Sequence, residues 1–445
     1  MGSQEPSKSS GPGVPRARRF DLRRRRKGRL TGRQSRALTG LAIIYGLRMM
    51  GLYMVLPVLS IFALSLSGAS PLLVGFALGA YGLTQALFQI PLGHLSDRYG
   101  RKTVISVGLG LFAAGSLLAS FGTHIILLIA GRILQGSGAV ASAVVALAAD
   151  LSPSHARTQA MARLGIWVGI ALAVGIASGP AIASALGVPV LFLATAVLSA
   201  GAIVYLQLAV PEPVRPSRMR RNGAPQPVSA GLMEQVEGVS TDGESTIRAG
   251  NLREVLSQPA LFLLCAGIFL LHATLTALFV IMPVRLTAFV GQGTLSLILA
   301  PAIGIGLVLM LLSARVADRH ERRRTTFLLG AVLLVVSCAV LTAFPDLFLG
   351  LVLGLGAFIM SLSLLEPLLP ALVSQRAPAH HRGTAIGVFH MSQFLGSFAG
   401  GPVGGVFLTG EISHLFLVLG IIALLWTILL HNSRSSVFLR TDTAR

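Results

Sequence analysis

The sequence contains few charged residues and almost no cysteine, and each shortage excludes a class of protein. Charged residues make up 12% of its 445 residues, whereas about 25% is usual in soluble globular proteins. A single soluble globular domain is therefore excluded. The two cysteines, Cys265 and Cys338, lie in separate apolar segments, so neither a disulfide framework nor a metal-ligand spacing is present.

The sequence also lacks the motifs of common enzymes. It has no phosphate-binding loop, no supported serine–histidine–aspartate arrangement and no ATPase motif. These motifs carry nucleotide binding or nucleophilic catalysis. We therefore expect no enzyme activity, no cofactor and no metal.

Apolar residues are abundant, at 53% of the chain, and they gather into long stretches. A stretch of about 18 residues crosses roughly 30 Å of hydrocarbon as a helix, and in lipid a helix satisfies its own backbone hydrogen bonds. The sequence therefore predicts an all-α membrane protein with twelve transmembrane helices. The twelve stretches are 37–64, 71–95, 103–121, 125–149, 158–186, 188–210, 259–284, 294–317, 325–344, 347–374, 383–409 and 413–431.

A polar segment divides these helices into two sets of six. Residues 211–258 carry six basic and six acidic residues, with proline, glycine and serine throughout. A short surface helix is expected at 251–257. The expected organisation is a basic tail 1–36, a six-helix bundle 37–210, the linker 211–258, a second six-helix bundle 259–431 and a tail 432–445.

An internal repeat supports the division into halves. Asp97-Arg98 recurs as Asp318-Arg319, 221 residues later, and Gly179-Pro180 recurs as Gly401-Pro402, 222 residues later. The matched offsets indicate a duplicated six-helix unit. Parallel six-helix halves with a site between them are a transporter architecture.

The cations indicate the orientation of the chain. The net charge of +20 alone would suggest nucleic acid, but 33 of the 36 Lys/Arg fall in the tails, linker and turns of one side, against Arg285 on the other. Cytoplasmic loops carry such an excess, so we expect both termini in the cytoplasm. The basic tail 1–36 either fixes this orientation, which we favour, or binds anionic lipid or nucleic acid, or mimics a transit peptide. We expect a monomer with no nucleic-acid partner and no cleaved signal peptide.

The strongest local motif is the turn after the second helix, Gly93-His94-Leu95-Ser96-Asp97-Arg98-Tyr99-Gly100-Arg101-Lys102. Gly93 allows close helix approach, and Gly100 permits a tight turn. Asp97 at a helix end can meet a positive helix N-terminus or an arginine. The alternative is a basic turn with an incidental acid. The stretch resembles the signature loop between helices 2 and 3 of the major facilitator superfamily.

Two further motifs agree with this resemblance. Arg132-Ile133-Leu134-Gln135-Gly136-Ser137-Gly138-Ala139 resembles the arginine motif of helix 4. Gly175-Ile176-Ala177-Ser178-Gly179-Pro180 resembles the glycine–proline motif of the antiporter branch, although Ala183-Ser184 stands where that motif ends in two glycines. We expect Gly175, Gly179, Pro180, Gly401 and Pro402 to serve helix packing.

A narrower resemblance is to the YajR-type bacterial inner-membrane transporters. It is carried by segments 47–51 and 55–59 of helix 1, 81–86 of helix 2, 366–370 of helix 10 and 392–396 of helix 11. That branch's namesake has a soluble domain after its last helix. This chain ends at Arg445, so no function of that domain is expected.

The resemblance implies roles for the turn. Asp97 would hold the cytoplasmic ends of helices 2 and 11 together when the protein opens outward. Arg98 or Arg101 would pair with Asp150 at the end of helix 4. The second copy of the turn, at 314–319, lacks both glycines and would be the weaker latch.

Four ionisable residues lie inside predicted helices 1, 4, 7 and 10, namely Arg48, Arg132, His272 and Glu366. Such groups are costly in a bilayer and usually face a cavity or a partner. In the superfamily these four helices line the central cavity. The four residues are therefore candidates for proton coupling.

Each of these groups has an alternative role. Glu366 either binds and releases a proton or forms a fixed pair with Arg48 or Arg132 that joins the halves. His272 either titrates or makes a neutral hydrogen bond between helices. Arg132 contacts an anion, belongs to the proton path or is structural, and His390 is interpreted as a packing residue.

Uncharged polar residues are candidates for substrate contact. Tyr81, Gln85 and Gln89 recur at steps of four on one face of helix 2, and Gln135 and Gln393 lie in helices 4 and 11. Hydrogen bonding between helices is the alternative explanation for such residues.

Together these observations predict a secondary active transporter of the bacterial inner membrane that works by alternating access. Proton-coupled export of a small organic or amphiphilic solute is the favoured function, with the bilayer, the solute and protons as partners. Solute uptake by symport or uniport is the first alternative. A membrane sensor or scaffold that does not transport is the second.

Overall fold

The computed structural model of the chain describes Gly2 and residues 32–153, 156–211, 257–291, 293–316, 320–378 and 382–433. Helices account for nearly all of these ranges, and the strand-like pairing among them is an isolated bridge between Ser67 and His124. Four expected features lie wholly or partly outside the described residues: Met1 and residues 3–31 of the tail 1–36, residues 212–256 of the linker 211–258, residues 251–256 of the short helix 251–257, and the Asp318-Arg319 copy of the turn.

The described residues of the first half form eight helical segments. The predicted first helix, 37–64, is interrupted at 56–58, where Pro57 lacks the backbone N–H that a continuous helix requires. The predicted fourth helix, 125–149, is interrupted at 138–140, where Gly138 leaves the helical conformation. The segments are α2 (Gly32–Val55), α3 (Leu59–Leu64), α4 (Pro71–Tyr99), α5 (Arg101–Ser120), α6 (Ile125–Ser137), α7 (Ala141–Asp150), α8 (Arg157–Leu186) and α9 (Val188–Ala209).

The second half consists of six continuous helices. Eleven of the twelve predicted stretches are long and apolar enough to cross a membrane. The twelfth forms α17, which has 25 residues and is rich in glycine. The helices are α13 (Pro259–Val290), α14 (Leu295–Val316), α15 (His320–Ala343), α16 (Phe348–Arg376), α17 (Arg382–Val406) and α18 (Ile412–Asn432).

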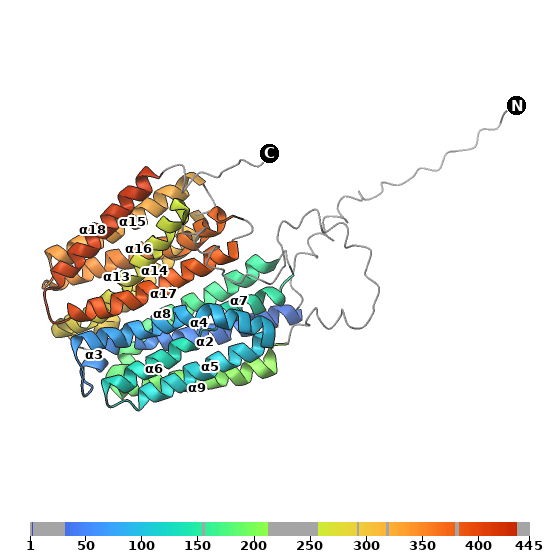
Figure 1. Cartoon of the computed structure of the whole chain (residues 1–445), viewed down its shortest axis with the longest axis horizontal. Helices are drawn as coiled ribbons and strands as arrows, with labels where there is room; N and C mark the ends of the chain where they lie inside the picture. The colour runs from blue at the N-terminus through green and yellow to red at the C-terminus, as the bar shows by residue number, and fades with distance from the viewer. Residues whose placement is uncertain are drawn as a thin grey trace.

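The helices pack as two bundles that touch along two seams. Within the first half, α2 packs on α8 and α9, and α5 packs on α6 and α9. Within the second half, α13 packs on α17 and α15 packs on α16 and α18. The halves meet where α4 lies along α17 and where α8 lies along α14. Figure 1 shows α2–α9, in blue to green, below α13–α18, in yellow to red.

The seam between α4 and α17 is made of glycines. A Cβ atom on Gly75 would overlap the backbone of α17 at Gly401, and one on Gly401 would overlap α4 at Gly75 and Gly79. Small residues of this kind let two membrane helices approach to backbone contact. The two helices run in opposite directions, so this contact joins the start of α4 to the end of α17. The halves are therefore closed at the end of the bundle opposite to the basic turns.

Candidate functional site

A central cavity of about 760 Å³ lies between the halves. It runs from Glu366 and His272 in the middle of the bundle to Asp97, Arg101 and Thr384 at the basic end. Most of the other residues along its wall are apolar or aromatic. The cavity thus reaches the basic end, while the glycine seam closes the opposite end.

Four side chains of the second half form a polar cluster on the wall of this cavity, which we call the Glu366 cluster: His272 of α13, Glu366 of α16, and His390 and Gln393 of α17. The Gln393 Nε2 atom donates to Glu366 Oε1 at 3.0 Å and lies 2.9 Å from His272 Nε2. The Gln393 Oε1 atom lies 3.0 Å from His390 Nδ1. One amide therefore links a carboxyl group and two imidazoles from three helices.

With the Gln393 amide in this orientation, the two contacts fix one tautomer for each imidazole. Because the Gln393 N–H group donates, His272 Nε2 is the acceptor; because Gln393 Oε1 accepts, His390 Nδ1 carries the hydrogen. Glu366 Oε2 lies 3.8 Å from His272 Nε2 and, within the described residues, has no hydrogen-bond partner. The Glu366 side chain is 35% exposed. The carboxyl group of Glu366 thus has one hydrogen-bonded oxygen and one oxygen without a hydrogen-bond partner among the described residues.

Arg48 is held entirely within the first half. Its Nη2 donates to Tyr81 Oη at 3.3 Å, to Gln85 Oε1 at 3.3 Å and to the carbonyl of Gly138 at 3.0 Å. The guanidinium also lies over the ring of Phe112, 4.9 Å from its centroid. The break between α6 and α7 has a physical consequence, because it frees the Gly138 carbonyl to accept this bond.

Arg132 is likewise bound by first-half groups. It donates to the Ala77 carbonyl at 3.3 Å and to Gln135 Oε1 at 2.7 Å, and it lies over the ring of Tyr81. The expected alternative of a fixed pair between Glu366 and Arg48 or Arg132 is therefore wrong for this conformation. The hydrogen bonds of both arginines go to first-half groups, and Arg48 Nε and Nη1 have no hydrogen-bond partner among the described residues. Glu366 is hydrogen-bonded to Gln393 of the second half.

The predicted substrate residues divide into two groups. Tyr81, Gln85, Gln89 and Gln393 line the central cavity, and Gln85 also donates to Gln89 Oε1 at 3.3 Å. Gln135 is buried away from the cavity wall and donates to Ser116 Oγ at 2.7 Å. The geometry thus corrects the expectation for Gln135, which joins helices instead of facing a solute.

In the basic turn, Arg101 contacts three polar side chains. Arg101 forms an ion pair with Asp97 and donates to Asp150 Oδ2 at 3.1 Å and to Ser96 Oγ at 2.7 Å. Of the two candidates for the Asp150 pair, Arg101 is the one that makes it. The Arg98 guanidinium lies over the Tyr99 ring instead.

The turn also places Asp97 at the mouth of the cavity. Its side chain is 52% exposed, and within the described ranges no contact between Asp97 and α17 is recorded. Gly100 has a φ of +107°, a conformation that residues with a Cβ rarely adopt. Gly93 faces Ser142 of α7. The predicted contact between Asp97 and helix 11 is therefore not formed among the described residues of this conformation.

The two copies of the glycine–proline motif pack differently. Gly175 and Gly179 lie against the backbone of α2 around Met50 and Met54, so they serve packing within the first half. Gly401 and Pro402 lie against α4 and serve the contact between halves. The two copies of the motif therefore share their sequence but contact different partners: the first contacts its own half, and the second contacts the other half.

The sequence predicts a packing role for His390, and the structure corrects this prediction. Its ring lines the central cavity and contacts Gln393. The spacing of three residues places both side chains on one face of α17. That spacing is the signal by which the sequence indicates their association.

Comparison with known proteins assigns the chain to one family. Residues 41–401 and 291–437 match the Major Facilitator Superfamily. The chain is 39% identical over 380 residues to the inner membrane transport protein YajR of Escherichia coli K12, covering 85% of this chain and 78% of that protein. It is 30% identical over 377 residues to an uncharacterized transporter of Buchnera aphidicola, covering 83% and 89%.

Solved structures share the fold. A D-xylose–proton symporter superposes with a TM-score of 0.66 at 14% identity, covering 88% of this chain and 96% of that one. A peptide transporter of the POT type superposes with a TM-score of 0.68 at 15% identity, covering 90% and 94%.

Proposed function

Because the chain belongs to the major facilitator superfamily and is a multi-pass inner-membrane transporter, we propose that it exports a small amphiphilic organic solute in exchange for protons. The observation that carries this proposal is Glu366, a carboxyl group on the cavity wall with one oxygen that has no hydrogen-bond partner among the described residues. Ionisable groups in such positions mark proton and solute pathways.

The Glu366 cluster provides a route for the proton. Protonation of Glu366 at Oε2 makes this oxygen a donor, and His272 Nε2 is the nearest ring nitrogen, at 3.8 Å. For the carboxyl group to donate to the imidazole, a side-chain rotation must bring Oε2 closer and the Gln393 N–H must first leave the His272 Nε2 lone pair. The Gln393 amide keeps both groups in place because it contacts each of them.

Exchange follows if the solute and the proton compete for Glu366. In the present conformation the cavity opens to the basic end, which the excess of Lys/Arg assigns to the cytoplasm. A solute entering there displaces the proton from the cluster. Closure of the Asp97 latch and opening of the glycine seam then expose the same site to the other side.

The cavity wall supports an amphiphilic solute. Its aliphatic and aromatic residues, such as Leu275, Phe279 and Phe394, surround a limited number of polar groups. Ligand sites of this composition bind apolar bodies and orient them through a few polar contacts. The polar groups along the wall include Tyr81, Gln85, Gln89 and the Glu366 cluster.

The test is a screen of organic amphiphiles in liposomes that contain the purified protein under an imposed proton gradient. We expect gradient-driven flux in wild type, its loss in Glu366→Gln, and its retention in Glu411→Gln, an exposed acid at the other end of the bundle. Equal flux in wild type and Glu366→Gln would remove Glu366 from the coupling role.

Measurement of solute levels in whole cells decides the direction of transport. Export predicts that expression of the protein depletes the identified solute from cells, and uptake by symport or uniport predicts accumulation. Absence of flux for every solute, together with a tightly bound partner, would instead favour a sensor or scaffold.

A further inference from the structure

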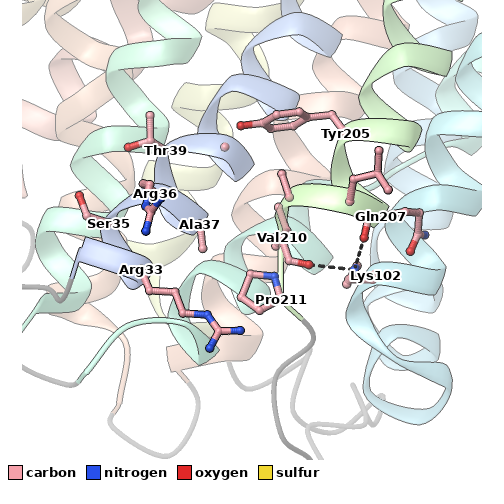
Figure 2. Close-up of a pocket in the computed structure, with 13 residues that line it drawn as sticks. Arg33, Ser35, Arg36, Ala37, Thr39, Lys102, Tyr205, Gln207, Val210 and Pro211 are labelled. Carbon is pink, nitrogen blue, oxygen red and sulfur yellow. Dashed lines mark hydrogen bonds between the residues drawn. The ribbon is translucent and has the colours of Figure 1, made fainter.

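A second cavity, of about 740 Å³, lies at the basic end of the first half and shares no residue with the central cavity. We call it the basic groove. It is bounded by the start of α2, the start of α5 and the end of α9 (Figure 2). Its charged residues are Arg33, Arg36 and Lys102, and none of its described lining residues is acidic.

Lys102 forms the fixed back of the groove. Its Nζ donates to the carbonyls of Gln207 at 3.2 Å and Val210 at 2.8 Å, and the residue is buried (Figure 2). These carbonyls end α9, where helical carbonyl groups lack internal partners. The ammonium therefore ties α5 to α9 and leaves its positive charge without a carboxylate.

Arg33 and Arg36 form the open side of the groove. Both side chains are exposed, and neither forms an ion pair with a carboxylate in the part of the chain that the structure describes. The one hydrogen bond recorded for them joins Arg36 Nε to the Gly32 carbonyl at 3.4 Å. Two guanidinium groups beside a buried ammonium attract an anion, and the planar guanidinium matches a phosphate in a bidentate manner.

The third side of the groove is apolar. Tyr205 and Leu208 of α9 line it and are 43% and 83% exposed. Val204 and Val197, on earlier turns of the same helix, are 59% and 63% exposed. In a membrane helix this exposed apolar surface faces acyl chains, and a tyrosine near the helix end lies at the level of the lipid headgroups.

From this arrangement we infer that the basic groove binds the phosphodiester headgroup of an anionic phospholipid, with Arg33 and Arg36 on the phosphate and the acyl chains along the exposed face of α9. A soluble anion would use the cations but gain nothing from the apolar side. A bound lipid would bridge α2 to the α5–α9 pair, because the three helices contribute to one groove. Cationic pockets at the ends of membrane helices are suited to such headgroups.

The test measures lipid binding to the full-length purified protein by native mass spectrometry, with titrated phosphatidylglycerol. We expect Arg33→Gln combined with Arg36→Gln to weaken phosphatidylglycerol binding by about 30-fold, since each arginine near an anionic lipid contributes about 1 kcal/mol. The control, Arg434→Gln with Arg440→Gln, removes the same charge from the C-terminal tail and is expected to leave the affinity within about twofold of wild type.

Two further measurements distinguish a phospholipid site from a site for a soluble anion. Leu208→Glu places an acid at the exposed apolar edge without disturbing packing, and it should also weaken phosphatidylglycerol binding. Glycerol phosphate should compete poorly, because it lacks acyl chains. Equal affinity of wild type and the double arginine variant would overturn the inference. Competition by glycerol phosphate as strong as that by phosphatidylglycerol would also overturn it and would indicate a site for a soluble anion.

Discussion

The carboxyl group of Glu366 and the imidazole of His272 lie 3.8 Å apart, between Oε2 and Nε2, on different helices. Both contact the amide of Gln393 on a third helix. Any movement of α13, α16 or α17 relative to the others changes this geometry. If Glu366 carries the proton, as we propose, proton binding at the cluster would be linked to rearrangement of the second half.

Gln393 should act through Glu366. Gln393→Leu removes the donor to the carboxyl group, and a hydrogen bond to a charged group contributes about 1.5–3 kcal/mol, so we expect proton-driven flux to fall by about tenfold or more. The double variant with Glu366→Gln should be no worse than Glu366→Gln alone, because residues of one network are not additive. Additive losses in the liposome flux assay would show that the two residues act separately.

Gly75 and Gly401 should control which end of the bundle is closed. Gly75→Val introduces side-chain atoms where the α17 backbone lies, and overpacking of this kind costs about 1–3 kcal/mol. We expect a shift of about 5- to 150-fold towards the conformation in which the seam is open. Labelling of cysteines introduced near Pro71 should increase. Gly356→Val, at a helical glycine with open space around it, should leave labelling unchanged.

Asp97→Asn should favour the conformation described here. Asp97 pairs with Arg101 and is half exposed at the cavity mouth, so its loss costs this state little. In the opposite state the carboxylate would meet the start of α17, where an anion near a helix N-terminus contributes about 0.3–1 kcal/mol. Cysteine labelling at the basic end should rise by about two- to fivefold, and equal labelling at both ends in wild type and variant would count against the latch.

Gly100→Ala should lower stability through the backbone alone. The φ of +107° at Gly100 is outside the range that alanine adopts without strain, which costs about 1–2 kcal/mol. A reduced thermal unfolding midpoint in detergent is expected. Gly110→Ala, in the interior of α5 with no neighbouring atom close to a new Cβ, should instead leave the midpoint equal or slightly higher.

Much of the fold follows from the sequence because hydropathy and length fix where helices lie. The predicted stretch 71–95 became α4 and 413–431 became α18 with small changes at their ends. The breaks at 56–58 and 138–140 were not predicted. At the second of these, the freed Gly138 carbonyl accepts a bond from Arg48 across 90 residues, and such a distant partner has no local signature.

The site was less accessible to sequence reasoning. Intramembrane charge draws attention to Glu366 and His272, and the structure places their side chains 3.8 Å apart. It could not show that Arg48 and Arg132 are bound by carbonyls, hydroxyls and rings of their own half, because neutral partners leave no charge pattern in the sequence. The open end of the cavity also depends on which helix contacts are formed, such as Gly75 with Gly401, and the same sequence supports either conformation.

Proton release on solute binding tests the coupling role of Glu366 most directly. An identified solute is added to the purified protein in weakly buffered detergent solution, and a pH-sensitive dye records the protons. Competition for Glu366 predicts release of up to about one proton per chain in wild type and in Glu411→Gln, and none in Glu366→Gln. Equal release from wild type and Glu366→Gln, with unchanged solute affinity, would contradict the proposal that Glu366 carries the proton.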